Sequence, residues 1–202
     1  MNRRVPRAVS RGGGGRRTPR RGQSMCAESA TAEVLYRIAA GTAREAFEVF
    51  GPSVEFVTWS DEEHGQFCVM RAVVPPGVTV PLHSHPDAED FLILAGTHQV
   101  LIESDRGLRW QDAHAGDYVR IPGGVLHAHR NVSDEPAVDL IVTTLRMGKF
   151  FTEVGLPSTG EPIAVTADRL RHFVAITQKY GYTLASPEQN AAVGIDLPVF
   201  SG

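Results

Sequence analysis

Three histidines and one glutamate, His83, His85, Glu89 and His127, form the most chemically informative set in this sequence. Imidazole nitrogens together with a carboxylate oxygen make a mixed donor set that suits a divalent transition metal. If the four side chains converge in the fold, we expect them to hold one such ion. The donor set alone does not choose among iron, manganese, nickel, cobalt, copper and zinc.

Strand geometry explains how these side chains could converge. His83 and His85 are two residues apart, so on a β-strand they point to the same face. The chain is interrupted at Pro86, and Glu89 then begins the next strand. His127 follows a turn rich in glycine and proline and lies on a separate strand. Three strands can therefore deliver four ligands into the interior of one barrel.

The region from about residue 54 to residue 145 has the sequence pattern of a β-barrel or sandwich. Short runs rich in Val, Ile, Thr and Phe alternate with turns that contain Gly, Pro and Asp, which is typical of many short strands. The expected strands are 54–59, 66–74, 79–85, 89–95, 98–104, 107–111, 117–121, 126–130 and 137–145.

Two helices are expected outside this region. The first covers residues 31–50 and carries a loose apolar stripe. The second covers residues 166–180, where Thr166 can cap the N-terminus and Gly181 is well placed just beyond the C-terminus. The chain after Pro187 is expected to be extended.

These elements predict four segments. Residues 1–24 are an Arg- and Gly-rich tail, residues 25–53 a helical arm, residues 54–147 the barrel, and residues 148–202 a C-terminal helix with an extended tail. The first segment holds eight arginines, no acidic residue and few apolar residues. Such a segment cannot bury enough apolar surface to fold, so we expect it to be disordered.

Composition excludes several classes of partner for the folded body. Beyond residue 24 the chain holds 12 basic and 23 acidic residues. Nucleic-acid binding is not expected, because phosphate contacts need clustered cations. No apolar run approaches the roughly 18 residues that span a membrane, so no membrane partner is expected. Cys26 and Cys68 are expected to be free thiols in a reducing compartment, which predicts a cytoplasmic protein.

Two segments resemble the paired motifs of the cupin superfamily. The first motif reads G-(x)5-H-x-H-(x)3-E-(x)6-G and the second G-(x)5-P-x-G-(x)2-H-(x)3-N. The chain matches all ten fixed positions, namely Gly77, His83, His85, Glu89, Gly96, Gly116, Pro122, Gly124, His127 and Asn131.

This resemblance implies a mainly β fold, the double-stranded β-helix or jelly-roll barrel, here with an N-terminal helical arm and a C-terminal helix. It also implies that His83, His85, Glu89 and His127 are the metal ligands. Many cupins dimerise, so the resemblance predicts a homodimer. One motif pair is present, as in small monocupins.

His129 departs from the pattern, because many cupins carry an aromatic residue at this position. It shares the strand face of His127 and should also point inward. It is either a core histidine bonded to a backbone carbonyl or a catalytic residue beside the metal, for example a proton shuttle. The other histidines have no such context and are expected to be ordinary: His64, His98, His114 and His172.

Three classes of function stay open, all with a small-molecule ligand. The segment 148–155 loosely resembles the region after the barrel in quercetinase-like monocupins. That resemblance implies a dioxygenase that binds an enolate or flavonol-like hydroxyl on the metal, with Glu89 as ligand and proton acceptor. A redox-neutral isomerase, lyase or cyclase would instead polarise a carbonyl and use a base such as His129. The third class is a binding or sensor protein without turnover.

The pocket lining should separate possible substrates. A roomy apolar pocket would favour an aromatic compound, and a small arginine-lined pocket would favour a keto acid. Arg71 and Arg120 lie on expected strands, where we expect them to be solvated. If either points inward, it could bind a carboxylate through two hydrogen bonds.

Overall fold

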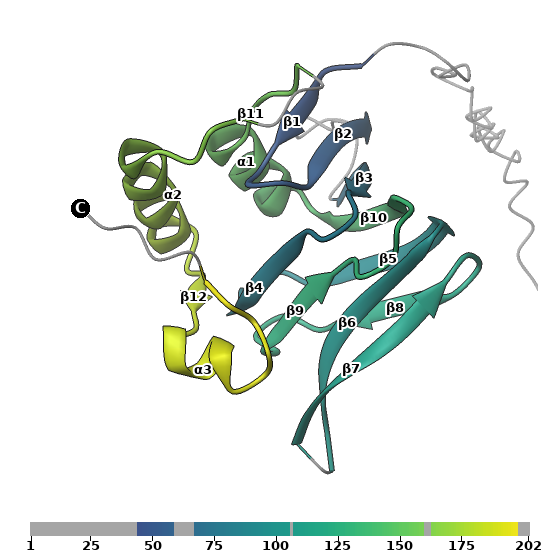
Figure 1. Ribbon diagram of the computed structural model, residues 1–202. Coiled ribbons are helices and arrows are strands. Elements are labelled where there is room, and N and C mark those ends of the chain that lie inside the picture. The colour runs from purple at the N-terminus through teal and green to yellow at the C-terminus, as the bar shows by residue number, and fades with distance from the viewer. Residues whose placement is uncertain (1–43, 59–66, 106, 160–162, 198–202) are drawn as a thin grey trace, which may run out of the picture. The chain divides into compact units, whose positions relative to one another are not determined.

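The computed structural model describes residues 44–58, 67–105, 107–159 and 163–197. These residues form two antiparallel sheets and three short helices (Figure 1). The strands are β1 (Ala46–Glu48), β2 (Ser53–Thr58), β3 (Phe67–Val74), β4 (Thr79–Ser84), β5 (Glu89–Ala95), β6 (Thr97–Ser104), β7 (Gly107–His114), β8 (Tyr118–Ile121), β9 (His127–Arg130), β10 (Ala137–Thr144), β11 (Leu156–Pro157) and β12 (Thr183–Leu184). The helices are α1 (Leu145–Val154), α2 (Ala167–Lys179) and α3 (Pro187–Ala191).

The two sheets enclose a common core. One sheet has the strand order β11-β1-β2-β3-β10-β5-β8, and the other has the order β12-β4-β9-β6-β7. The main core cluster takes Met70, Phe91 and Ile141 from the first sheet and Val100 and Ala113 from the second. Burial of apolar side chains between two such sheets is the main stabilising term of this architecture. The predicted fold class, a double-stranded β-helix, is confirmed.

The strands predicted from the alternating sequence pattern are all present. Their ends differ from the predicted ends by three residues or fewer, and the largest difference is in β7, which pairs with β6 along its whole length. The strands that the sequence pattern did not predict, β1, β11 and β12, have two or three residues each. Such short strands carry too few residues for an alternating pattern.

The predicted helix over 31–50 is wrong at its C-terminal end. Ala46–Glu48 form β1, which pairs with β2 and β11. Phe50 and Gly51 have positive φ angles of 54° and 121°, so the chain reverses there and returns as β2. Pairing with two neighbouring strands outweighs the loose apolar stripe that favoured a helix.

The N-terminal part of the chain cannot be compared with its predictions. The predicted tail over 1–24, the remainder of the helix up to residue 43, and Cys26 lie outside the described residues. Cys68 is described, and it is a buried free thiol, as predicted. Burial raises the pKa of this thiol to about 11.

The helix predicted over 166–180 is confirmed as α2. The Thr166 hydroxyl accepts a hydrogen bond from the backbone N–H of Arg169, and Gly181 follows the helix with a φ of 72°. Helix α1, directly after β10, was not predicted. It packs against α2, and Phe150 and Val154 share an apolar cluster with Tyr180.

The prediction of an extended chain after Pro187 is wrong, because residues 187–191 form α3. Ser186 and Gln189 make a capping box at its N-terminus. That pair is visible in the sequence as a helix-start signal. None of the helices in the described ranges is long and apolar enough to cross a membrane.

The C-terminal segment is tied to the strand that carries His83. Strand β12 pairs with β4, opposite Ser84 and His83. The side-chain oxygen of Asn190, which is fully buried, accepts a hydrogen bond of 2.9 Å from the backbone N–H of Leu82. The amide of the same Asn190 donates to the carbonyl of Ala185 at 3.2 Å. One residue of α3 therefore fixes both β4 and the chain that follows β12.

Asn190→Ala is expected to lower the free energy of unfolding by about 3 kcal/mol, because buried backbone groups lose their partners. Equilibrium denaturation with urea measures the change. Gln178→Ala, on the exposed face of α2, is the control and should leave stability nearly unchanged. An Asn190→Ala protein as stable as the unmodified chain would contradict this role.

Candidate metal centre

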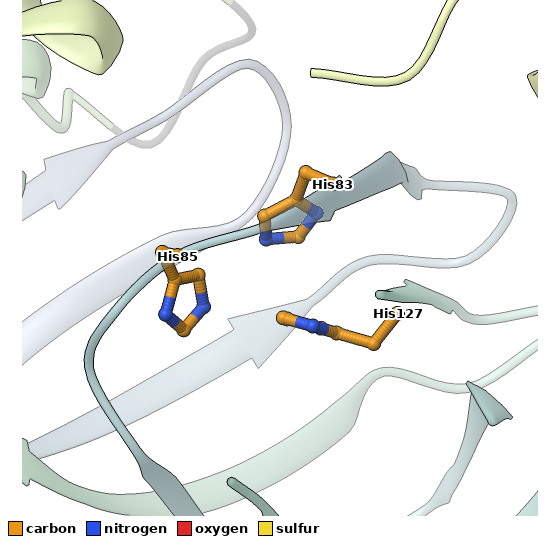
Figure 2. Close-up of side chains that lie close together, drawn as sticks. All are labelled: His83, His85 and His127. Atoms are coloured by element: carbon orange, nitrogen blue, oxygen red, sulfur yellow. The ribbon is translucent and has the colours of Figure 1, made fainter. Parts of the chain in front are cut away.

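The structure places the four predicted ligands, which come from three strands, in two overlapping groups that share His127: His83, His85 and His127 form one, and Glu89, His127 and His129 form the other. His83 lies on β4 and pairs with His127, the first residue of β9. His85 follows β4 directly, and Glu89 begins β5. Figure 2 shows the rings of His83, His85 and His127 pointing toward one another, and each ring offers a nitrogen within 4.8 Å of the others. Glu89 Oε2 lies 3.5 Å from His85 Nε2 and 3.6 Å from His127 Nε2.

Backbone carbonyls fix the tautomer of the three imidazoles. In each ring, Nδ1 lies within hydrogen-bond distance of the carbonyl oxygen of a residue two positions away. The pairs are His83 with Pro81 at 2.7 Å, His85 with Asp87 at 2.9 Å, and His127 with Val125 at 2.8 Å. A carbonyl only accepts, so Nδ1 carries the hydrogen and Nε2 of the neutral ring keeps its lone pair. Metal-binding histidines are commonly oriented in this way.

Several hydrogen-bond acceptors converge on Glu89 without a donor between them. Nε2 of His85, of His127 and of His129 is buried and has no hydrogen-bond partner within the described ranges. All three nitrogens lie within 4.0 Å of Glu89 Oε2, which is itself an acceptor. Buried polar atoms without partners are costly, and facing lone pairs add repulsion. A bound cation would satisfy all of these atoms at once, so the group could hold a divalent metal ion.

Burial and neighbouring charges shift the pKa values in the cluster. Burial, assisted by the nearby His127, lowers the pKa of His83 to about 3. Burial also lowers the pKa of His129 well below its usual range. Burial alone would raise the pKa of Glu89, but the adjacent rings of His127 and His85 lower it further than burial raises it. The rings of His85 and His127 can donate a hydrogen bond to Glu89 only when Nε2 carries a second proton. A proton and a metal ion would therefore compete for the same nitrogen atoms.

His129 points inward as predicted, but its partner is not a backbone carbonyl. Its Nδ1 lies 3.0 Å from Nε2 of His98, and Nδ1 of His98 lies 2.6 Å from Oδ2 of Asp139. All three side chains are buried. No sequence pattern singles out His98 or Asp139, because they lie on β6 and β10 and meet only in the folded barrel. The chain of hydrogen bonds ends at buried Asp139 and not at the surface.

The cluster borders a cavity of about 560 Å³. Its polar lining includes His83, His85, Glu89 and His129, together with His98, Asp139 and Tyr182. Most of the other lining side chains are apolar and come from both the barrel and the helices, among them Phe91, Ile141, Phe150, Leu170 and Phe173.

Neither of the two arginines singled out in the sequence reaches this cavity. Arg120 is exposed, and Arg71 lies near Glu55 with 41% of its side chain accessible. The lining is therefore that of the roomy apolar pocket and not that of the small arginine-lined one.

Tyr182 is a polar residue of the cavity that the sequence did not reveal. Its ring stacks on Phe150 at 4.2 Å and lies 4.9 Å from the ring of His85. Its hydroxyl is buried and has no hydrogen-bond partner in the described part of the chain. Burial, followed by the charge of Glu89, raises the pKa of this phenol, so it is a neutral donor. It follows α2 outside both motifs, where no local signal marks it.

Residues 70–143, which carry both motifs and the four candidate ligands, match the cupin domain family. A comparison with curated proteins found no match.

Several solved structures are similar to parts of this chain. The DMSP lyase DddQ from Ruegeria pomeroyi DSS-3 is 30% identical over 39% of this chain and 38% of its own, with a TM-score of 0.35. The match thus spans well under half of that lyase. The polyketide cyclase RemF from Streptomyces resistomycificus is 16% identical over 70% of this chain and 99% of its own, with a TM-score of 0.48. A sugar phosphate isomerase of the cupin superfamily from Silicibacter pomeroyi is 24% identical over 46% of this chain and 59% of its own, with a TM-score of 0.38.

His83→Ala and His127→Ala are each expected to abolish stoichiometric binding of a divalent metal, because each removes one nitrogen of the cluster. Elemental analysis after dialysis against the metal measures this directly. His172→Ala, on the exposed face of α2, is the control and should keep the metal. Unchanged metal content in both site variants would show that the cluster is not a metal centre.

Proposed function

We propose that this protein is a metal-dependent enzyme that converts a small, largely apolar organic molecule, and that its reaction is a dioxygenation. The observation that carries this proposal is that Nε2 of His85, His127 and His129 all face Glu89 at the edge of an apolar cavity and have no partner among the described residues. His83, His85, Glu89 and His127 would hold the ion. When bound, the ion supplies a Lewis-acid or redox centre to the cavity.

The side chains around the cluster support an aromatic or similarly apolar substrate. Phe91, Phe150 and Phe173 line the cavity and make much of its wall apolar. The Tyr182 hydroxyl can donate a hydrogen bond to a substrate oxygen, since it has no partner among the residues that the structure describes. Glu89 can accept the proton of an enol or flavonol-like hydroxyl that enters the site. A cavity of about 560 Å³ is large enough for a ligand of this size.

A redox-neutral reaction is the second candidate, and a specific observation favours it. The cavity holds a neutral donor, Tyr182, and an acceptor nitrogen of His129, both without partners. A donor and an acceptor beside a Lewis acid can promote isomerisation, elimination or cyclisation of a carbonyl compound without any oxidant.

Oxygen consumption tests the first candidate. The full-length protein, loaded separately with iron, manganese, nickel and cobalt, is incubated with a flavonol, and dissolved oxygen is followed with an electrode. We expect consumption that depends on the added metal and is lost in Glu89→Gln. The matched control is the same flavonol methylated on its 3-hydroxyl, which cannot present an ionised oxygen to the site.

The other outcomes decide between the remaining classes. Turnover of an enolisable carbonyl compound under strictly anaerobic conditions would replace the dioxygenase proposal with the redox-neutral one. Firm metal binding without turnover in air or under anaerobic conditions would leave a binding or sensor protein and contradict the proposal of an enzyme.

Tyr182→Phe is expected to raise the free energy of unfolding by about 1 kcal/mol, because it removes a buried hydroxyl that has no partner. With a substrate that uses this hydroxyl, the same variant should raise KM about fivefold, the equivalent of one hydrogen bond worth about 1 kcal/mol. Denaturation curves and steady-state kinetics measure the two effects. Tyr118→Phe is the control, since Tyr118 is exposed and its hydroxyl donates to Asp90 at 2.5 Å. A loss of stability in Tyr182→Phe would show that the hydroxyl has a structural partner.

A further inference from the structure

We propose that His129 is a further ligand of the metal, a fourth imidazole beside those of His83, His85 and His127. The inference rests on the proposed metal site and adds a donor that is not one of the fixed positions of the paired motifs. His98 and Asp139 act as positioning residues, because they set which nitrogen of His129 faces the cluster.

The position of His129 is that of a ligand. Its Nε2 lies 4.0 Å from Glu89 Oε2. The ligand atoms of Glu89, His127 and His129 all lie within 4.8 Å of one another, and all three residues are buried. At metal–nitrogen distances of about 2.1 Å, donors of one octahedral ion lie roughly 3 Å apart in cis and roughly 4.2 Å apart in trans. His127 Nε2 and His129 Nε2 lie 3.6 Å and 4.0 Å from Glu89 Oε2, which is between these two values, so small movements of the side chains would bring the three atoms to one ion.

The buried pair His98 and Asp139 gives His129 the correct tautomer. The Asp139 carboxylate accepts the hydrogen on Nδ1 of His98 at 2.6 Å. In the proposed arrangement His98 carries only this one N–H, so its Nε2 accepts a hydrogen bond from Nδ1–H of His129 at 3.0 Å. The lone pair of His129 is therefore on Nε2, facing Glu89. In the other three rings a backbone carbonyl accepts from Nδ1–H and leaves the lone pair on Nε2. In His129 the side chain of His98 takes the place of the carbonyl.

An ordinary core histidine does not explain these contacts. Such a residue satisfies both ring nitrogens, because a buried nitrogen without a partner is destabilising. In His129, Nδ1 has a partner and Nε2 has none among the described residues. The barrel also buries the carboxyl group of Asp139, which is fully inaccessible to solvent. Burial of the Asp139 carboxylate is unfavourable. It is accounted for if Nε2 of His129, at the other end of this chain of hydrogen bonds, binds a cation.

A fifth protein donor limits what else can bind. An octahedral ion with four imidazoles and one carboxylate keeps one position for an exogenous molecule. In a dioxygenase of this design, the substrate oxygen would take that position and dioxygen would approach the substrate through the apolar cavity. A redox-neutral reaction requires only one free coordination position, which the substrate would take.

The number of ligating imidazoles can be counted in the cobalt(II) form of the full-length protein. Each histidine bound through Nε2 keeps its hydrogen on Nδ1, and the paramagnetic ion shifts that proton far outside the normal proton NMR range. In water we expect four such exchangeable signals, which disappear in D₂O. Three signals in the unmodified protein would overturn the inference without affecting the proposed three-histidine site.

Variants assign the fourth signal. His129→Phe introduces the kind of aromatic residue that many cupins carry at this position, so the barrel should remain packed. We expect it to lose one signal and to bind cobalt(II) about 10- to 100-fold more weakly, the range found when support of a ligand is lost. His98→Phe removes the acceptor that orients His129 and should shift or remove the same signal. The control is His114→Phe, an exposed histidine near Asp117, which should change nothing.

The two proposals fail in different ways. If the unmodified protein binds no cobalt(II) in equilibrium dialysis, both the metal site and the role of His129 are overturned. If it binds one ion, and His129→Phe keeps both the affinity and the number of shifted signals, only the role of His129 is overturned. Circular dichroism of each variant shows whether it is folded. If His129→Phe does not fold, the count of four or three signals in the unmodified protein decides alone.

Discussion

The site depends on hydrogen bonds between imidazole Nδ1 atoms and backbone carbonyls near the ends of strands. For His83 the carbonyl is that of Pro81, within β4. The pairing of β4 with β9 is irregular between Val80 and His83, so this part of β4 is out of the regular ladder. Asn190 and Ala185 bind the freed backbone groups of Leu82. The C-terminal segment therefore supplies partners for the part of β4 that is out of the regular ladder, and β12 lies beside β4 (Figure 1).

The fixed positions of the motifs describe backbone conformation as much as chemistry, which explains how far the sequence could predict the structure. Gly77, Gly96, Gly116 and Gly124 all have positive φ angles, between 73° and 96°. These are conformations that other residues adopt at a cost. Asn131 accepts from the backbone N–H of Ser133 and donates to the carbonyls of Val74 and Glu135. Local requirements of this kind appear in sequence spacing, and the barrel and the four clustered residues could be predicted from them.

Contacts between strands that are far apart in the sequence produce no recognisable spacing of residues. His98 on β6, His129 on β9 and Asp139 on β10 meet because β9 lies beside β6 and because β10 faces them across the core. No periodicity links residues on three strands of two sheets. Tyr182 is similar, because it reaches the cavity only after α1 and α2 have packed together and β12 has paired with β4. The groups that distinguish this site from a generic metal-binding barrel are thus the ones that sequence patterns could not predict.

The balance of charge inside the barrel indicates what kind of ion the site would hold. Glu89 and Asp139 are both buried, and no lysine or arginine lines the cavity in the part of the chain that the structure describes. Burial lowers the pKa values of His83 and His129, so these rings are neutral and do not compensate the two acids. Isolated buried charges are strongly unfavourable, and the cost falls when opposite charges are close and hydrogen-bonded. One divalent cation at the cluster would balance Glu89 directly, while Asp139 has the ring of His98 as its partner at 2.6 Å. A site built this way favours a divalent over a monovalent ion because of its charge, while the imidazole-rich donor set favours a transition metal over calcium or magnesium.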